Sequence, residues 1–394
     1  MKPLKTVFDD IIDRNDTCSV KWDYNGERFG RKDILPMWVA DMDFPSPPEV
    51  ADAIVKRAAH GVFGYTGASE QLYDAITDWM KKRNNWAIEK TWTVHTPGVV
   101  TSIITAILTF TAPGDRILIQ TPVYYPFFSS ILDNDRQLVM NPLINNHGHY
   151  EIDFEDLEKK LKGGVKMFIL CSPHNPVGRV WTAEELKRIA GLCIENGVLM
   201  VSDEIHSDLV YNEYMHVPIA SLDAGILHNS ITCISPTKTF NLAGLSQSTA
   251  IIPDAGLRRK FQKTLKMTGA GMLNIFGLEA AEAAYRYGEP WLEELMAYLS
   301  GNLDLLTGYF AEKIPTIKVA RPEGTYLAWL DCKELSSKVG NLKKFFIWKA
   351  GVGLNEGEQF GEDGTGFHRI NFACPRSVLL EGLQRIESAV KGLE

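Results

Sequence analysis

Short, almost wholly apolar runs alternate with helical patterns between about residues 91 and 248. The clearest runs are residues 165–171 and 198–201, and their length and composition suit parallel strands whose two faces are both covered. A sheet of this kind needs helices on both sides. The alternation therefore predicts an α/β fold, in which a large domain holds a mostly parallel sheet between helices.

Two sites in the sequence have the residues expected at the start of a helix. Thr182 and Glu185 form a capping box for a helix that ends just before Gly197. Ser46, followed by two prolines and Glu49, is expected to open a second helix in the same way.

The pattern changes after Pro253, where long helical stretches are followed by strand-like runs. These stretches and runs are residues 274–287, 291–310, 325–330 and 367–372. They predict a second, smaller α+β domain. We therefore expect a large domain over residues 46–285, a small domain over residues 286–394, and an N-terminal segment, residues 1–45, that packs with the small domain.

Composition excludes several classes of function. The 394 residues carry a formal net charge of −8 without a long basic run, so no nucleic-acid partner is expected. No apolar run is long enough to span a bilayer, and the N-terminus lacks the pattern of a signal peptide. The six cysteines are scattered, without metal-ligand spacing, and are expected to be reduced thiols. A cytoplasmic enzyme without a metal or a membrane partner is the prediction.

Four segments carry polar residues where an apolar run ends. They are TPGVV (96–100), CSPHNPVG (171–178), VSDEIH (201–206) and ISPTKTFN (234–241). In an open α/β sheet, ligands bind beyond the carboxyl ends of the strands, so residues that are distant in sequence are expected to converge there.

The residue types in these segments suit one cofactor. Asp203 follows a buried strand, where a carboxylate is costly unless it meets a cation such as a protonated pyridine nitrogen. Lys238 lies in a short polar turn, where loss of solvent lowers the pKa of an amine enough for Schiff-base chemistry. The hydroxyls of Ser235 and Thr237, with a helix that opens near Gly98, suit a phosphate. These are the groups that pyridoxal phosphate (PLP) requires.

The chain resembles the fold-type I PLP enzymes of the class I and II aminotransferase superfamily. Within it, the chain is most similar to the cystathionine β-lyase-like subgroup of C–S lyases, the MalY/PatB type. The resemblance extends over nearly the whole chain. It includes the segments LPMWVADMDFPSPP, HGVFGYTG, CSPHNPVG, SDEIH, TYLAWLD and RINFACPR.

The resemblance assigns roles around the cofactor. It implies that Lys238 binds the cofactor covalently and is the catalytic residue, and that Asp203 pairs with the ring nitrogen. Asn175 and His206 would hydrogen-bond the phenolic oxygen, and Tyr124 would stack on the ring. The residues implied for the phosphate are Gly98, Val99, Val100, Ser235, Thr237 and Tyr65 of the partner subunit.

A shared phosphate site implies a homodimer. For the substrate, the resemblance implies that Arg369 binds the α-carboxylate, with Trp38 and Tyr124 as further candidates. Trp38 and Tyr124 can equally be core residues, and for Trp329 core packing is the preferred interpretation. Many aminotransferases have an arginine on the phosphate where this chain has Ser246, and the lyase subgroup shares its absence.

The function that the resemblance implies is α,β-elimination from L-cystathionine, cystine or related S-substituted cysteines, which yields a thiol, pyruvate and ammonia. From cystathionine the thiol is homocysteine. Lys238 would act as the general base at the substrate Cα. An aminotransferase on the same scaffold remains the main alternative. A regulatory role through protein contact is a third possibility, with no direct support in the sequence.

Other motifs are weaker. Residues 235–238 satisfy the S-x-x-K pattern of penicillin-binding proteins, but the accompanying S-D-N and K-T-G motifs are missing. Glycines 61, 64 and 67 do not follow a strand, so they do not form a dinucleotide fingerprint. The glycine-rich residues 351–366 are expected to form a mobile loop rather than a phosphate site.

Overall fold

The computed structural model describes residues 7–393 and centres on one sheet of seven strands. Across the sheet the strands are β2 (Thr93–Thr96), β10 (Ser248–Ile251), β9 (Ser230–Ile234), β8 (Leu199–Asp203), β7 (Val165–Cys171), β3 (Arg116–Thr121) and β4 (Gln137–Pro142). β10 is antiparallel to both neighbours, and the other pairs are parallel. The predicted mostly parallel sheet is confirmed. Residues 1–6, which begin the predicted N-terminal segment, and residue 394 lie outside the described residues.

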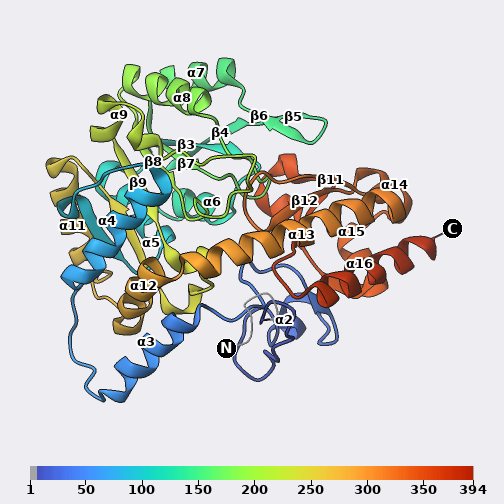
Figure 1. Ribbon diagram of the computed structural model, residues 1–394. Coiled ribbons are helices and arrows are strands. Elements are labelled where there is room, and N and C mark those ends of the chain that lie inside the picture. Colours follow the sequence, from blue (N-terminus) through green and yellow to red (C-terminus); the bar gives the residue numbers. More distant parts are fainter. Residues whose placement is uncertain (1–6, 394) are drawn as a thin grey trace.

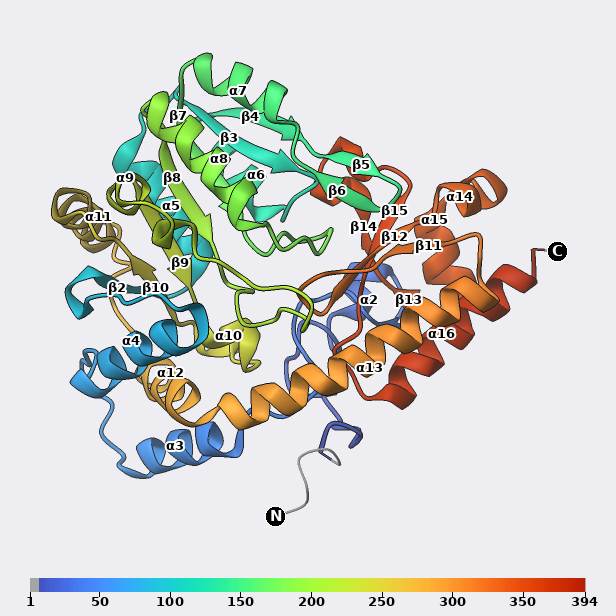
Figure 2. The same ribbon diagram turned by 45° about the horizontal axis from the view of Figure 1, so that its top comes forward.

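Helices cover both faces of the sheet (Figures 1 and 2). Side chains of β7 alternate between two buried clusters: Phe168 and Leu170 lie in one, and Met167 and Ile169 lie in the other. The first cluster includes helices α7 (Phe154–Lys162), α8 (Ala183–Glu195) and α9 (Ala224–His228). The second includes helices α5 (Val99–Phe110), α6 (Pro126–Leu132) and α11 (Ala255–Met267). Burial on both faces explains why this strand is apolar at nearly every position.

A second sheet of four antiparallel strands forms the core of the C-terminal part. Its order is β11 (Lys318–Ala320), β12 (Leu327–Asp331), β15 (Phe367–Asn371) and β14 (Asn355–Glu356). Around it lie α14 (Lys333–Val339), α15 (Leu342–Lys344), the π-helix η4 (Phe345–Ala350) and α16 (Arg376–Lys391). Trp329 is buried and stacks on Phe367, which confirms it as a core residue.

Three helices pack beside the large sheet, and a fourth connects the two sheets. Helices α3 (Pro48–Ala59) and α4 (Glu70–Asn84) contact α12 (Ile275–Tyr287). Helix α13 (Glu289–Lys313) then runs from α12 to the C-terminal part (Figures 1 and 2). A small hairpin of β5 (Ile144–Asn146) and β6 (His149–Glu151) extends from the large sheet.

The N-terminal segment lies against the C-terminal part. After α2 (Asn25–Phe29), strand β1 (Leu35–Pro36) pairs in parallel with β13 (Val352–Gly353). Asn371 on β15 donates hydrogen bonds to the carbonyls of Val39 and Asp41. These contacts agree with the expected packing of the segment, while the domain limits themselves stay a prediction.

The two predicted helix starts have different outcomes. The capping box of Thr182 and Glu185 is present in full, and Gly197 has a φ of +62° just after the helix. The second helix also begins where expected, but Pro47 is its N-cap, and no side chain caps it. The prediction that Ser46 is the cap is wrong, because its hydroxyl instead donates a hydrogen bond of 3.3 Å to the carbonyl of Asn241.

The glycine-rich residues 351–366, which were expected to form a mobile loop, are not one continuous loop, and the mobility of the segment stays a prediction. They contain β13, β14 and the 3₁₀ helices η5 (Gly357–Phe360) and η6 (Glu362–Gly364). Val352 and Phe360 are fully buried. A Cβ at Gly357 would lie 2.0 Å from the carbonyl oxygen of Gly364, so glycine allows two chain segments to pack closely here.

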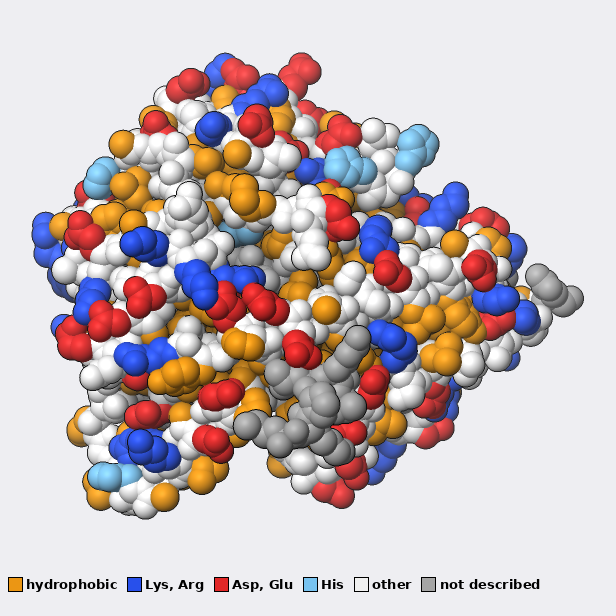
Figure 3. Space-filling model, in the orientation of Figure 1, with side chains coloured by type: hydrophobic (Ala, Val, Ile, Leu, Met, Phe, Trp, Pro, Cys, Tyr) orange, Lys and Arg blue, Asp and Glu red, His pale blue; other side chains and the backbone are white. Residues whose placement is uncertain are grey.

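The surface and the cysteines fit the composition. On the face seen in Figure 3, acidic and basic side chains are interspersed. All six cysteines are unpaired, and all but Cys18 are buried. Within residues 7–393, no helix has both the length and the hydropathy required to cross a bilayer.

Candidate active site

A cavity of about 240 Å³ lies at the carboxyl ends of the central parallel strands and the start of α5. It brings together residues from all four polar segments. Of the predicted site residues, those that line it are Gly98, Val99, Val100, Tyr124, Asn175, Asp203, His206, Thr237 and Lys238. The convergence expected beyond the strand ends is therefore present.

Asp203 is the last residue of β8 and is buried. Its carboxylate accepts a hydrogen bond of 3.1 Å from the backbone N–H of Ile205. Burial raises the pKa of Asp203 to about 7, and the nearby Lys238 offsets this only in part. A cation placed against this carboxylate would remove much of the cost of ionising it.

Lys238 lies on the short helix α10 (Pro236–Thr239). Its Nζ donates a hydrogen bond of 2.6 Å to the carbonyl of Ala40. Burial lowers the pKa of Lys238 to about 8, against the opposing effects of Asp41 and Asp203. At pH 7 about a tenth of the amine is therefore neutral and nucleophilic, far more than for an ordinary lysine.

The N-terminus of α5 provides an anion site. Gly98 is its N-cap, no side chain caps the helix, and the space around Gly98 is open. The first N–H groups of a helix lack partners within it and attract negative charge. Because Gly98, Val99, Val100 and Thr101 all line the cavity, a phosphate fits at this end.

The two hydroxyls beside Lys238 are arranged differently. Thr237 lines the cavity, whereas Ser235 caps α10 and lies 2.6 Å from the carbonyl oxygen of Gln247, to which its hydroxyl donates. The oxygens of the two hydroxyls are 2.7 Å apart. With its only proton directed away, Ser235 is better placed to orient Thr237 than to bind a phosphate. Ser246, at the position of the absent arginine, also lines the cavity.

Arg369 is buried beside the cavity without an acidic partner among its hydrogen bonds. It donates to Asn175 Oδ1 at 2.9 Å, to Asn355 Oδ1 at 2.7 Å and to the carbonyl of Trp38 at 3.0 Å. Its Nε has no partner among residues 7–393. Burial lowers the pKa of Arg369 to about 10. A carboxylate would relieve this uncompensated charge.

His206 and Tyr124 complete the set of residues around the cavity. Burial lowers the pKa of His206 to about 3, so its ring is neutral, and its Nδ1 has no partner in the described chain. Burial raises the pKa of Tyr124, which keeps its hydroxyl protonated. Both side chains can therefore hydrogen-bond a ligand without bringing charge of their own.

Trp38 and Tyr65 also lie outside the cavity, as Ser235 and Arg369 do. The ring of Trp38 packs edge-on against Phe29, with the Arg28 guanidinium 5.1 Å from the ring centroid, and only its carbonyl contacts Arg369. Tyr65 is fully exposed, as a residue that acts on a partner subunit would be.

Some residues of the cavity were not predicted from the sequence. They are Ala40, Pro97, Thr101, Cys171, Ile205, Ala243 and Gln247. Pro97, Cys171 and Ile205 lie inside the segments already singled out, and Thr101, Ala243 and Gln247 follow shortly after two of them, so wider segments would have included them. Ala40 lies two residues after Trp38 in a segment that carries the resemblance, but its side chain gives no sign of a role at the site.

The residues present fit PLP. The buried Asp203 suits a cationic ring nitrogen, and Lys238, in the same cavity, suits an aldehyde. The uncapped start of α5 suits a phosphate. Within residues 7–393, no group of three or more His, Cys, Asp or Glu side chains is arranged to bind a metal ion.

Comparisons with known proteins agree on the family. Residues 32–386 match the family model of class I and II aminotransferases. The chain is 44% identical over 384 residues to the cystathionine beta-lyase PatB of Bacillus subtilis, covering 97% of this chain and 99% of that protein.

Solved structures give the same result. The chain superposes on cystalysin from Treponema denticola, whose crystal structure contains PLP, with a TM-score of 0.95 and 38% identity, covering 98% of this chain and 99% of that one. For the PLP-bound C–S lyase from Staphylococcus hominis, the TM-score is 0.91 and the identity 36%, with 97% of both chains covered.

Proposed function

Because the chain belongs to the family of class I and II aminotransferases, we propose that it is a PLP-dependent carbon–sulfur lyase that acts on S-substituted cysteines such as L-cystathionine and cystine. The observation that carries the proposal is the placement of Asp203 and Lys238 in one cavity of about 240 Å³. The 44% identity to a cystathionine beta-lyase favours carbon–sulfur cleavage on this scaffold.

Different residues of the cavity are proposed to bind different parts of PLP. Lys238 would hold the aldehyde, Asp203 would pair with the ring nitrogen, and the start of α5 with Thr237 would bind the phosphate. Asn175 and His206 would hydrogen-bond the phenolic oxygen, and Tyr124 would lie against the ring. When bound, PLP supplies an electron-withdrawing ring that stabilises negative charge at the substrate Cα.

Lys238 also moves the protons of the reaction. Its amine has a pKa of about 8, so it can act as a general base near neutral pH and remove the Cα proton. The Cβ–S bond then breaks, and the sulfur leaves with the bonding electrons and takes up a proton. With one water molecule consumed, one cystathionine gives one homocysteine, one pyruvate and one ammonium ion, whereas cystine would release a persulfide in place of the thiol.

Arg369 orients the substrate. Its guanidinium is buried beside the cavity, and its Nε has no partner among the described residues. A substrate α-carboxylate would supply the negative charge that Arg369 lacks. This contact would hold the Cα–H bond within reach of Lys238.

The test is a product analysis without a keto-acid acceptor. Wild-type protein is incubated with L-cystathionine, and pyruvate and free thiol are measured over time, with Lys238→Ala and the exposed-site variant Lys260→Ala as controls. We expect equal amounts of pyruvate and homocysteine from the wild type and Lys260→Ala, and neither product from Lys238→Ala. Absence of thiol from cystathionine, cystine and S-alkyl cysteines alike would refute the lyase function.

An aminotransferase is the second candidate, and the family model that matches residues 32–386 favours it. It would use the same lysine but transfer the amino group to a keto acid. Release of the amino group only when a keto acid is added, with no thiol formed, would support it. A regulatory role and a cytoplasmic location stay predictions.

A homodimer is part of the proposal. Tyr65 is fully exposed, and the neighbouring Val62 and Phe63 are more than half exposed, as is Met272 across a surface groove. Exposed apolar side chains that lie together mark interaction surfaces. A second copy of the chain would bury them and bring Tyr65 of the partner subunit to the phosphate.

A further inference from the structure

The carbonyl of Ala40 is the hydrogen-bond acceptor for two groups at the active site. Lys238 Nζ donates to it at 2.6 Å, and the Tyr326 hydroxyl donates to it at 2.9 Å. Ala40 lies almost two hundred residues before Lys238 in the chain and lines the same cavity. The position of the N-terminal segment therefore determines where the free amine of Lys238 is held.

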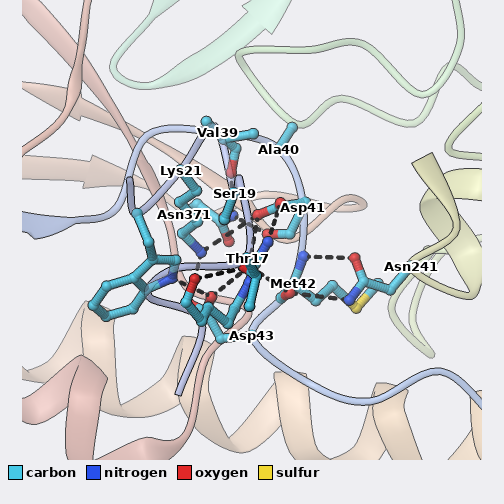
Figure 4. Close-up of polar contacts among 12 residues, drawn as sticks. Thr17, Ser19, Lys21, Val39, Ala40, Asp41, Met42, Asp43, Asn241 and Asn371 are labelled. Carbon is cyan, nitrogen blue, oxygen red and sulfur yellow. Dashed lines mark hydrogen bonds and ion pairs between the residues drawn. The ribbon is translucent and has the colours of Figure 1, made fainter. Parts of the chain in front are cut away.

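Two asparagines fix the backbone on either side of Ala40 (Figure 4). Asn371 Nδ2 donates to the carbonyls of Val39 and Asp41 at 2.5 and 2.6 Å. Asn241 accepts from the N–H of Met42 at 3.0 Å and donates to the carbonyl of Met42 at 3.0 Å. Because the neighbouring carbonyls are all engaged, the carbonyl of Ala40 remains for Lys238 and Tyr326.

Four charged side chains, which we call the anchor cluster, also hold the stretch of residues 39–43 in place. They are Arg14, Lys21, Asp41 and Asp43. Arg14 donates to both oxygens of Asp41, at 2.7 and 3.2 Å, and to Asp43 at 2.7 Å. Lys21, which is 1% exposed, donates to Asp43 at 2.7 Å and lies 3.7 Å from Asp41. Two positive and two negative charges balance, so Lys21 and Asp43 can be buried, while Arg14 and Asp41 stay partly exposed.

Stability alone is a weak reason for such a cluster. Taking ions out of water costs about as much as their attraction returns, so apolar residues of similar volume would stabilise the fold equally well. Ion pairs with several directed hydrogen bonds do impose one geometry on the backbone that carries them. Here that backbone is the stretch whose central carbonyl receives Lys238.

The charges around Lys238 make Asp41 the member of the cluster that bears on the amine. The charged and titratable groups that face Lys238 are Asp41 from the N-terminal stretch, Asp203 and His206 from the end of β8, Arg369 from β15, and Tyr326. Burial lowers the pKa of Lys238, Arg369 lowers it further, and Asp41 and Asp203 raise it. Of the two aspartates, Asp203 is the group assigned to the cofactor ring.

We propose that Asp41 is a positioning residue for Lys238: through the anchor cluster it fixes the stretch of backbone whose Ala40 carbonyl accepts the hydrogen bond of the free amine. This rests on the proposed function in one respect, namely that Lys238 is the reactive lysine. The role differs from substrate binding, because no atom of Asp41 needs to contact a ligand.

The first test measures the pH dependence of Lys238 in full-length protein from which PLP has been removed. Trace acetylation between pH 6 and 10, read by mass spectrometry, gives the pKa of the Lys238 amine in the wild type and in Asp41→Asn. Without the ion pair to Arg14, the Ala40 carbonyl is held less firmly against the protonated amine, so this pKa should fall by about half a unit and labelling at pH 7 should be about two- to threefold faster. Asp33→Asn is the matched control, because Asp33 also pairs with an arginine in the same segment but is exposed.

The control should titrate as the wild type does. A folded Asp41→Asn protein whose Lys238 titrates at the wild-type pH would overturn the proposal.

A second variant decides the matter if Asp41→Asn does not fold. Lys21→Met combined with Asp43→Asn removes one charge of each sign and leaves the pair of Arg14 and Asp41 intact. With the stretch held less firmly, capture of added PLP by the apoprotein, followed by absorbance, should slow about five- to tenfold. An unchanged capture rate in this folded variant would refute the positioning role.

Neither readout uses a substrate. A protein that responds as expected in both tests but releases no thiol would refute the lyase function and leave the positioning role standing. A protein that releases thiol from cystathionine but responds in neither test would support the lyase function and refute the positioning role.

Discussion

Asp203 is an acid buried where its charge is poorly tolerated, so the stability of the cofactor-free protein should depend on pH. Its folded-state pKa of about 7 lies above the reference value of 3.8. The folded chain therefore binds a proton that the unfolded chain lacks between these values. This contribution is complete below about pH 4 and is lost as the pH rises through 7.

The prediction compares the wild type with Asp203→Asn, which cannot ionise. From pH 5 to pH 8, the unfolding free energy of the wild-type apoprotein should fall by about 2–3 kcal/mol relative to this variant, measured by urea denaturation. Asp52→Asn, at an exposed site on α3, is the control and should show a constant difference. A difference between wild type and Asp203→Asn that does not change with pH would show that Asp203 is not held in this environment.

Arg369 leads to a kinetic prediction. Its fork of donors can bind a carboxylate through two parallel hydrogen bonds, which a lysine cannot reproduce. Arg369→Lys should therefore raise KM for cystathionine about tenfold or more, with a smaller effect on kcat. Arg385→Lys, on the outer helix α16, is the control. An unchanged KM would remove Arg369 from the substrate site.

At single positions, the sequence identifies which residues meet but not always which atoms face the cavity. Asp203 and Lys238 were predictable because each follows an apolar strand at the same edge of the sheet. Ser235 and Thr237 are both hydroxyl residues beside Lys238, yet only Thr237 lines the cavity. The Ser235 hydroxyl instead donates to the carbonyl of Gln247, the residue before β10. Such a choice depends on the path of a neighbouring segment, which no local pattern encodes.

Among the elements, α8 offers a direct test of local sequence control. Its capping box satisfies two backbone groups at the helix start, through Thr182 and Glu185. Thr182→Ala should lower the unfolding free energy by about 1 kcal/mol, measured by urea denaturation of the holoenzyme. Lys187→Ala, at an exposed site in the same helix, should have little effect. Equal stability of the two variants would show that the box contributes nothing to the fold.

Elements were predictable where the local signals agreed, and less so where tertiary contacts competed. β7 matches its predicted limits of 165–171, because burial on both faces makes the strand uniformly apolar. Ser46 is of a residue type that often caps a helix, but its hydroxyl donates a hydrogen bond to the carbonyl of Asn241 instead. Residues 351–366 read as a loop because of their glycines, whereas Val352 and Phe360 between them belong to the core. At Gly357 the missing side chain allows two chain segments to pack closely.

At the scale of the whole molecule, the active site depends on segments from both ends of the chain. Ala40 comes from the N-terminal segment, and Arg369 comes from the C-terminal sheet. Both meet residues of the large sheet, and helix α13 connects the two parts (Figure 2). Such distant contacts form only in the complete fold, which explains why the sequence did not single out the Ala40 carbonyl as a partner of Lys238.

The proposed dimer extends this dependence to a second chain, and complementation can test it. If Tyr65 acts on the partner's site, the Tyr65→Ala and Lys238→Ala defects fall in the same site of a heterodimer, and the other site is intact. One of its two sites then combines an intact Lys238 with Tyr65 of the partner subunit. In an equal mixture, half of the dimers are mixed, so about a quarter of the wild-type activity should return.

The matched control replaces Tyr65→Ala with Arg369→Ala, mixed again with Lys238→Ala. Arg369 and Lys238 serve the same cavity of one chain, so every site in this mixture has a defect and no activity should return. If the Tyr65→Ala mixture also stays inactive although the variants form heterodimers, Tyr65 serves its own subunit or no site at all. Because Tyr65 is fully exposed in the single chain, that result would leave the proposed shared site without its main structural support.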